Sequence, residues 1–143
     1  MAPRNNQPLP QGMLVLGWCG LLPFAGALVL AFTQPGWRDL ALTAFIAYAA
    51  VILSFLGGAR WGRGLAADVS PWRYVEAVLP SLIGFVALLL AHRPLPALCL
   101  LTAGFLIWMV IDLRDPLWSP AYRRMRGGIS VAVLVLHGVW FVL

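Results

Sequence analysis

The sequence predicts an all-α integral membrane protein, a bundle of five transmembrane helices. Of its 143 residues, 62% are apolar and only 10% are charged, whereas roughly 25% of the residues of soluble domains carry charge. The mean hydropathy is +0.87. Apolar runs recur five times, and the short segments between them hold nearly every charged residue and proline. These observations exclude a water-soluble globule and a disordered chain.

The first two predicted spans are residues 13–32 and 40–59. The first is too long for the apolar core of a cleaved signal peptide, which is roughly 7 to 15 residues, so we expect it to be retained. The second carries no charge. A run of about 20 residues, at about 1.5 Å per residue, crosses a hydrocarbon core of roughly 30 Å.

The three remaining spans are residues 75–91, 95–111 and 128–143. The third span carries Pro80 near its start, where a kink or a broken first turn is expected. The connection between the third and fourth spans, residues 92–94, is so short that the two must form an antiparallel hairpin. Together the five spans form a single domain.

The arginines predict how the domain lies in the membrane. Residues 1–12 are a short polar tail, and residues 13–143 form the five-span domain. The tail and the connections after the second and fourth spans share one side, which holds most of the arginines (Arg4, Arg60, Arg63, Arg73, Arg114, Arg123, Arg124, Arg126). The positive-inside rule therefore predicts N-in and C-out. Tryptophans at span edges agree with aromatic belts at both interfaces (Trp37, Trp61, Trp72, Trp118, Trp140).

Net charge points to lipid as a partner. The formal charge is +5, and all basic residues are arginines. Because they lie between apolar runs, we expect them to meet anionic lipid headgroups and no nucleic acid, for which a basic helix outside the runs would be needed. A membrane-protein partner or a second copy of the chain is a further expected contact.

A stripe of small residues marks the inner half of the second span. Ala50, Ser54, Gly58 and Gly62 recur every four residues, so they lie on nearly one helical face. Small residues let helices approach closely in lipid. The favoured interpretation is packing within the bundle, and the alternative is a ligand groove or a dimer seam.

Ionisable residues converge next to this stripe. Arg60 and Arg63 follow it, Glu76 opens the third span, and Asp112 ends the fourth span on the same side. Charges at this depth are costly unless paired, so we predict that Arg60 or Arg63 faces Asp112 or Glu76. With Arg124 they form a candidate inner-face cluster. A structural ion-pair cluster is favoured over an anchor for a lipid headgroup or a substrate.

The connection at residues 115–126 mixes aromatic and basic residues. It resembles an amphipathic segment at the membrane interface, with Trp118 and Tyr122 at headgroup level. Lipid contact is the favoured role, and a basic surface for a partner subunit is the second.

His137 is the titratable group that lies well inside a span. A proton relay or metal site needs a second ligand or titratable group at similar depth, and the spans offer only hydroxyl groups, so we favour a hydrogen bond across helices. A haem held by His92 and His137 is disfavoured because the two lie at different depths. The sequence contains no catalytic triad, HExxH, P-loop or GxSxG motif. We therefore expect no cofactor, no metal and no enzymatic activity.

Residues 47–62, with the sequence AYAAVILSFLGGARWG, resemble the family called domain of unknown function 3429, small multi-span membrane proteins that include the transmembrane protein 69-like proteins of bacteria and mitochondria. Residues 20–24 and 80–82, and Asp112 with residues 122–126, fit the same family. The resemblance covers nearly the whole chain. It implies an inner-membrane protein, bacterial because no transit peptide precedes the first span, and no assigned reaction.

Within that resemblance Arg60, Trp61, Asp112 and Arg124 are positions in family motifs with no established role. We therefore expect a non-catalytic structural or accessory subunit of a larger membrane complex.

The alternative is a small carrier or channel for an anionic or lipid-like solute. It would use the ionisable residues Arg60, Arg63, Asp112 and His137. An enzyme acting on lipid headgroups is a third class, and it would need an open inner cleft lined by Glu76, Asp112 and the arginines.

Overall fold

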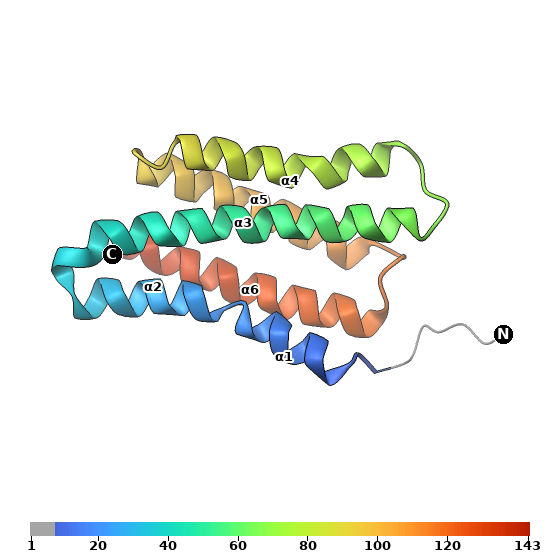
Figure 1. Cartoon of the computed structure of the whole chain (residues 1–143), viewed down its shortest axis with the longest axis horizontal. Coiled ribbons are helices and arrows are strands. Elements are labelled where there is room, and N and C mark those ends of the chain that lie inside the picture. Colours follow the sequence, from blue (N-terminus) through green and yellow to red (C-terminus); the bar gives the residue numbers. More distant parts are fainter. Residues whose placement is uncertain (1–7) are drawn as a thin grey trace.

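A computed structural model describes residues 8–143, and every element in this part of the chain is helical. The helices lie side by side (Figure 1). Five stretches are long and apolar enough to span a membrane, and the first of them comprises two helices. The predicted five-span bundle is therefore confirmed. The elements are α1 (Gln11–Cys19), α2 (Leu22–Thr33), the 3-10 turn η2 (Pro35–Trp37), α3 (Arg38–Leu65), α4 (Trp72–Leu89), α5 (Pro94–Arg114) and α6 (Pro120–Val142).

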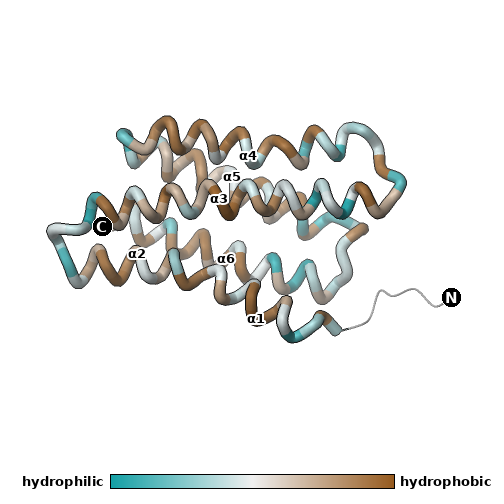
Figure 2. Tube along the Cα trace, in the orientation of Figure 1, coloured by the Kyte–Doolittle hydropathy of each residue, from teal (hydrophilic) through white to brown (hydrophobic). Residues whose placement is uncertain are grey.

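α3 occupies the middle of the bundle. It packs against α2, α4 and α5, while α6 packs against α5, α1 and α2. Hydrophilic residues gather at the two ends of the helices and hydrophobic residues lie between them (Figure 2). We call the end that contains the α3–α4 and α5–α6 connections, residues 66–71 and 115–119, the charged end. Part of the expected tail at residues 1–12 lies outside the described residues, and this part includes Arg4.

The first span is broken rather than continuous. α1 ends at Cys19 and α2 begins at Leu22, with Pro23 in its first turn. Proline lacks the N–H that would continue the helix, and its ring clashes with the carbonyl one turn back, which belongs to Cys19. The neighbouring carbonyl of Gly20 accepts a hydrogen bond of 3.0 Å from the Tyr48 hydroxyl of α3. A backbone acceptor at the break thus gains a partner from another helix.

Two helices extend furthest beyond the predicted apolar spans at the charged end. α3 continues past residue 59 to Leu65, and α6 begins at Pro120 instead of residue 128. The N-terminus of α6 is capped by Ser119, whose hydroxyl accepts the Tyr122 N–H at 3.2 Å. Most of the segment expected as an interfacial connection is therefore the first turns of α6. Apolar runs miss such turns because helices need not end where the hydrocarbon ends.

The predicted small-residue stripe is only half correct. Ala50 is buried and its carbonyl lies against Gly84 of α4, where Ser54 also contacts that glycine. Gly58 and Gly62, however, are exposed, and a methyl group at either would meet no atom within 4 Å. Four residues advance about 40° beyond one full turn of an α-helix, so a strict four-residue repeat winds off the contact face.

The buried residues of α3 instead recur at alternating spacings of three and four residues. Seven residues fall only about 20° short of two full turns, so these residues stay on one face of the helix. Its members beyond the middle of the helix are Ala50, Leu53, Gly57, Arg60 and Gly64. At Gly57 the α3 backbone lies so close to α4 that a Cβ would collide with the Ala77 carbonyl oxygen. Glycine is therefore required at position 57 by the neighbouring helix.

Aromatic rings fill the interior of the bundle in the half that lies away from the charged end. Phe24 and Phe45 are fully buried, with ring centroids 5.1 Å apart, and Phe105 is 1% exposed. Trp140 was expected in an interfacial belt but is buried, with its ring 5.6 Å from that of Phe45. Its position near the C-terminus predicted an interfacial location, but Trp140 lies on the buried face of α6.

Candidate functional site

Arg60 is the centre of a network of charged side chains at the charged end. It is 7% exposed and lies on the buried face of α3. One terminal nitrogen, Nη1, donates to Asp112 Oδ1 at 3.1 Å and to Asp115 Oδ2 at 2.9 Å. The other, Nη2, donates to Glu76 Oε2 at 2.9 Å. One guanidinium therefore binds carboxylates from α4, the end of α5 and the connection that follows.

Asp112 extends the network to α6. While Oδ1 accepts from Arg60, Oδ2 accepts a hydrogen bond from Arg126. Arg126 also donates to the Tyr122 hydroxyl at 3.3 Å, and its guanidinium lies over the rings of Trp118 and Tyr122 at 5.7 and 5.5 Å from their centroids. Asp112 and Arg126 are both buried, and each has a further partner besides the other, which offsets the cost of their desolvation.

Asp115 extends the network back to α4. Its Oδ2 accepts from Arg60 and also from Arg73, and its Oδ1 accepts the Leu117 N–H at 2.9 Å. The resulting chain alternates in sign, with Glu76 attached at Arg60. We call these side chains the charge network: Arg60, Arg73, Glu76, Asp112, Asp115 and Arg126. Its cations and anions are equal in number, so the network has no net charge.

The structure brings together only part of the predicted cluster. Arg60, Glu76 and Asp112 meet as predicted. Arg63 does not join them, because it lies at the surface and donates to the Leu117 carbonyl at 3.2 and 3.0 Å. Arg124 is exposed and also lies outside the network. Three residues turn an α-helix by about 300°, so Arg63 leaves α3 in a different direction from Arg60.

Sequence reasoning missed Arg73, Asp115 and Arg126. A signal existed for each of the first two, since Arg73 stands three residues before Glu76 and Asp115 three residues after Asp112. Residues three apart are neighbours on a helix surface. Arg126 was assigned to a connection, so its helical face could not be considered.

The pKa of the Asp115 carboxyl reports on this arrangement. Burial alone would raise this pKa, but hydrogen bonds from Arg73 and the Leu117 N–H and the charges of Arg73 and Arg60 outweigh burial and hold it below the usual value of 3.8. The unfolded chain therefore binds the proton at a higher pH than the folded chain does. The contribution of Asp115 to the free energy of unfolding is fully present above the pKa that its carboxyl has in the unfolded chain. It is lost as the pH falls through the pKa that the carboxyl has in the folded protein.

As pH is lowered from about 6 to about 3, we expect the thermal midpoint of the Asp115→Asn variant to fall less steeply than that of the unmodified protein. The measurement is thermal unfolding in mild detergent at each pH. Asp68→Asn is the matched control, because Asp68 is an exposed carboxylate in the α3–α4 connection. Identical pH slopes for Asp115→Asn and the unmodified protein would contradict the assigned ion pairs.

His137 lies in the aromatic middle of the bundle and is fully buried. Its Nδ1 is 2.9 Å from the Val133 carbonyl of its own helix, and its Nε2 has no hydrogen-bond partner within residues 8–143. The rings of Phe24, Phe45 and Phe105 surround it at centroid distances of 6.0, 4.8 and 5.4 Å. The predicted hydrogen bond across helices is therefore wrong: the ring bonds to its own helix and packs as an aromatic side chain.

We expect His137→Phe to leave the thermal midpoint unchanged or to raise it slightly. The substitution keeps the aromatic contacts and removes a buried nitrogen without a partner, whose burial costs about 1–3 kcal/mol. His137→Ala, in contrast, opens a cavity and should destabilise the protein by about 2–5 kcal/mol. A large loss in His137→Phe would instead point to a specific role for the imidazole nitrogen.

The charge network joins the polar ends of the helices. Each terminal guanidinium nitrogen of Arg60 already binds a carboxylate, and both oxygens of Asp112 are bound. Residues on α3, α4, α5 and α6 are linked in this way at one end. The network therefore ties four helices together across their polar termini.

Comparisons with known proteins agree with the membrane fold. A family model described as "Protein of unknown function (DUF3429)" matches residues 9–142, which include every helix. The chain is 33% identical over 135 residues to Transmembrane protein 69 of Xenopus tropicalis, across 88% of this chain and 53% of that protein. The chain thus spans about half the length of the curated relative it matches. No solved structure shows a significant match.

Proposed function

The chain belongs to the DUF3429 family of proteins of unknown function, and from this premise we propose that it is a non-catalytic structural or accessory subunit of a larger membrane complex. The charge network carries the proposal. Its cations and anions neutralise one another and leave the terminal nitrogens of Arg60 occupied. Charges at this depth that satisfy one another suit a structural role.

The outer face of α3 supports a partner. Gly58 and Gly62 are exposed one turn apart, with open space where side chains would stand. Glycine lowers helix stability by about 1 kcal/mol relative to alanine. Small residues on a membrane-facing surface allow another helix to approach closely. The proposed contact with a partner subunit, or with a second copy, lies on this face.

Cysteine crosslinking in the native membrane tests this proposal. Cys19 and Cys99 are both exposed and can be replaced by alanine to give a background without thiols. Gly58→Cys should then crosslink to a partner or a second copy. Phe85→Cys on the exposed face of α4 is the control and should crosslink far less. A protein that is monomeric in mild detergent, with nothing crosslinked or co-purified, would overturn the proposal.

Lipid contact and membrane location are part of the same proposal. Exposed arginines remain at the charged end outside the network, among them Arg63, Arg114 and Arg124. Such residues attract anionic headgroups at about 1 kcal/mol each. We propose a bacterial inner membrane with the charged end in the cytoplasm, because arginines are scarce at the opposite end, where Arg38 and Arg93 lie.

A reporter fused after Leu143 measures this orientation. We expect it to behave as external, because five spans separate it from the N-terminal side. A cytoplasmic reporter at that position would contradict the N-in, C-out arrangement. Fusions in the α3–α4 connection should give the opposite signal and serve as the internal control.

The carrier alternative has weaker support. The residues it would use, Arg60 and Asp112, bind each other, and the middle of the bundle around His137 is filled by rings. Flux of an anionic solute in reconstituted vesicles that disappears in Arg60→Ala, with the variant still folded, would favour the carrier. The accessory role predicts no such flux in either protein.

A further inference from the structure

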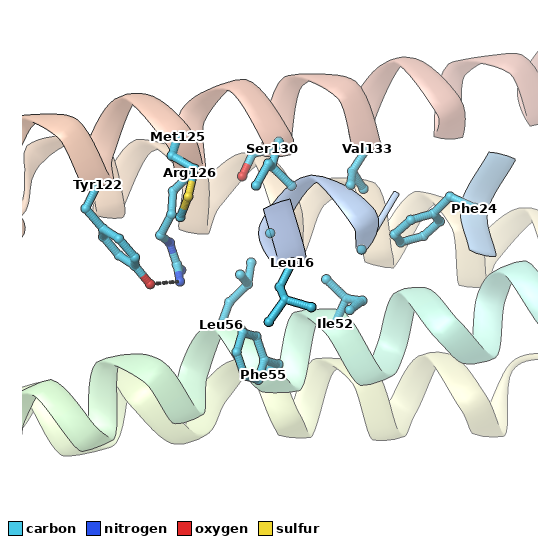
Figure 3. Close-up of a pocket in the computed structure, with 13 residues that line it drawn as sticks. Leu16, Phe24, Ile52, Phe55, Leu56, Tyr122, Met125, Arg126, Ser130 and Val133 are labelled. Atoms are coloured by element: carbon cyan, nitrogen blue, oxygen red, sulfur yellow. Dashed lines mark hydrogen bonds between the residues drawn. The ribbon is translucent and has the colours of Figure 1, made fainter. Parts of the chain in front are cut away.

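Two adjoining cavities near the charged end share one residue, Tyr122. The first has a volume of about 150 Å³ and lies between α1, α3 and α6 (Figure 3). Most of its walls are apolar, from residues such as Ile52, Leu56 and Ile129. A dry apolar cavity of about 150 Å³ is large enough to hold benzene, so several methylene groups fit.

The first cavity opens on the membrane-facing surface. Leu16 and Phe55 form part of its lining and are 75% and 66% exposed, whereas Phe24 and Val133 on its other side are 0% and 1% exposed. In a bilayer the exposed side faces hydrocarbon chains and not water. A lipid chain can therefore enter from the side.

The break in the first span lies beside this opening. Because α1 and α2 are separate helices, α1 bends away from α2, and none of its residues is buried (Figure 1). α1 contacts α6. The space left beside α3 is the first cavity.

Polar groups lie at the end of the first cavity nearest the charged end. Arg126 lines the cavity and is 6% exposed, yet its Nε has no hydrogen-bond partner within residues 8–143. Figure 3 shows Arg126 with Tyr122 at one end of the lining residues and Phe24 at the other. The two terminal nitrogens of Arg126 bind the Tyr122 hydroxyl and Asp112, so the guanidinium is a fixed positive group at this end of the cavity.

The second cavity is an open hollow on the surface that continues from Tyr122 toward the charged end, with a volume of about 480 Å³. Its lining combines Arg63, Trp118 and Ser119. The described residues place no carboxylate within ion-pair distance of Arg63, which is exposed. Arginine, tryptophan and a hydroxyl at the membrane interface are the groups that meet lipid headgroups.

We propose that the two cavities together bind one anionic phospholipid. One acyl chain enters the first cavity between Leu16 and Phe55, the ester region reaches Arg126 and Tyr122, and the phosphate lies against Arg63 in the second cavity. Charge complementarity selects an anionic headgroup, and the lateral opening selects a membrane lipid. This site does not depend on whether the protein has a partner subunit.

Native mass spectrometry with phosphatidylglycerol and phosphatidylcholine as probes tests the site. The purified protein in mild detergent should retain one phosphatidylglycerol, and added phosphatidylglycerol should raise its thermal midpoint, because ligands that bind only the folded state stabilise it. Arg63→Gln should weaken binding about fivefold to tenfold. Arg124→Gln, at an exposed arginine that lines neither cavity, should bind as the unmodified protein does.

Two further variants test the acyl-chain cavity. Ser130→Leu fills it, and Ser81→Leu makes the same change on the exposed face of α4. Only Ser130→Leu should lose the lipid. Leu16→Trp places a larger side chain at the opening of the first cavity and should also weaken lipid binding. Because Leu16 is exposed, this variant can still be tested if Ser130→Leu does not fold. Equal binding of phosphatidylcholine would overturn the headgroup assignment, and full retention of lipid in Arg63→Gln and Leu16→Trp would overturn the site.

Discussion

Replacing Arg60 with methionine should destabilise the folded protein by about 3–5 kcal/mol, the usual effect of removing one partner from a buried ion pair. Methionine is also a long, unbranched side chain, so the main change is electrostatic. Glu76, Asp112 and Asp115 would then face only Arg73 and Arg126, which leaves one negative charge in the network without compensation. Thermal unfolding in mild detergent and titration with sodium dodecyl sulfate measure the loss.

Arg63→Met is the matched control in lipid-free detergent, because Arg63 lies on the same helix near Arg60 but is exposed. Its effect should stay within about 0.5 kcal/mol. The double variant Arg60→Met/Glu76→Gln restores charge balance and should recover part of the lost stability, which a double-mutant cycle measures as coupling. Equal effects of Arg60→Met and Arg63→Met would show that the network contributes nothing to the fold.

Gly57→Ala should destabilise the protein by about 1–3 kcal/mol, although alanine is the better helix former. The added methyl group would collide with the Ala77 carbonyl oxygen and lie 3.1 Å from Pro80 Cγ. Both obstacles belong to the backbone or to a rigid ring, so neither can rotate away. α3 and α4 would have to separate, and the Arg60–Glu76 pair one turn further along would be disturbed.

Gly58→Ala provides the control at the neighbouring position. A methyl group there meets no atom within 4 Å, so only the helix preference for alanine remains. We expect a gain of up to about 1 kcal/mol in the isolated protein. The two adjacent substitutions should therefore have opposite signs in thermal unfolding. A shared sign would contradict the close packing of α3 on α4. If Gly58 contacts a partner in the membrane, Gly58→Ala should weaken that complex.

The sequence predicted the spans well and the helical faces less well. Long apolar runs define spans because about 20 residues are needed to cross a bilayer. The pairing of Arg60 with Asp112 and Glu76 followed from their shared end. Gly58 and Arg63 were placed at contacts but are exposed. Proximity along the chain groups residues by depth, whereas contact also depends on the direction in which each side chain leaves its helix.

The sequence by itself determined that the chain spans a membrane, how many spans it has and at which end of the helices most charges lie, because these depend on runs of residues summed along the chain. Only the tertiary structure decided which charges meet and where space remains. Asp115 joined Arg60 because the end of α5 lies beside α3, and a cavity that no apolar run reveals lies next to the break before Pro23. Such features arise from helix rotation and tilt, which are set by packing between segments distant in sequence.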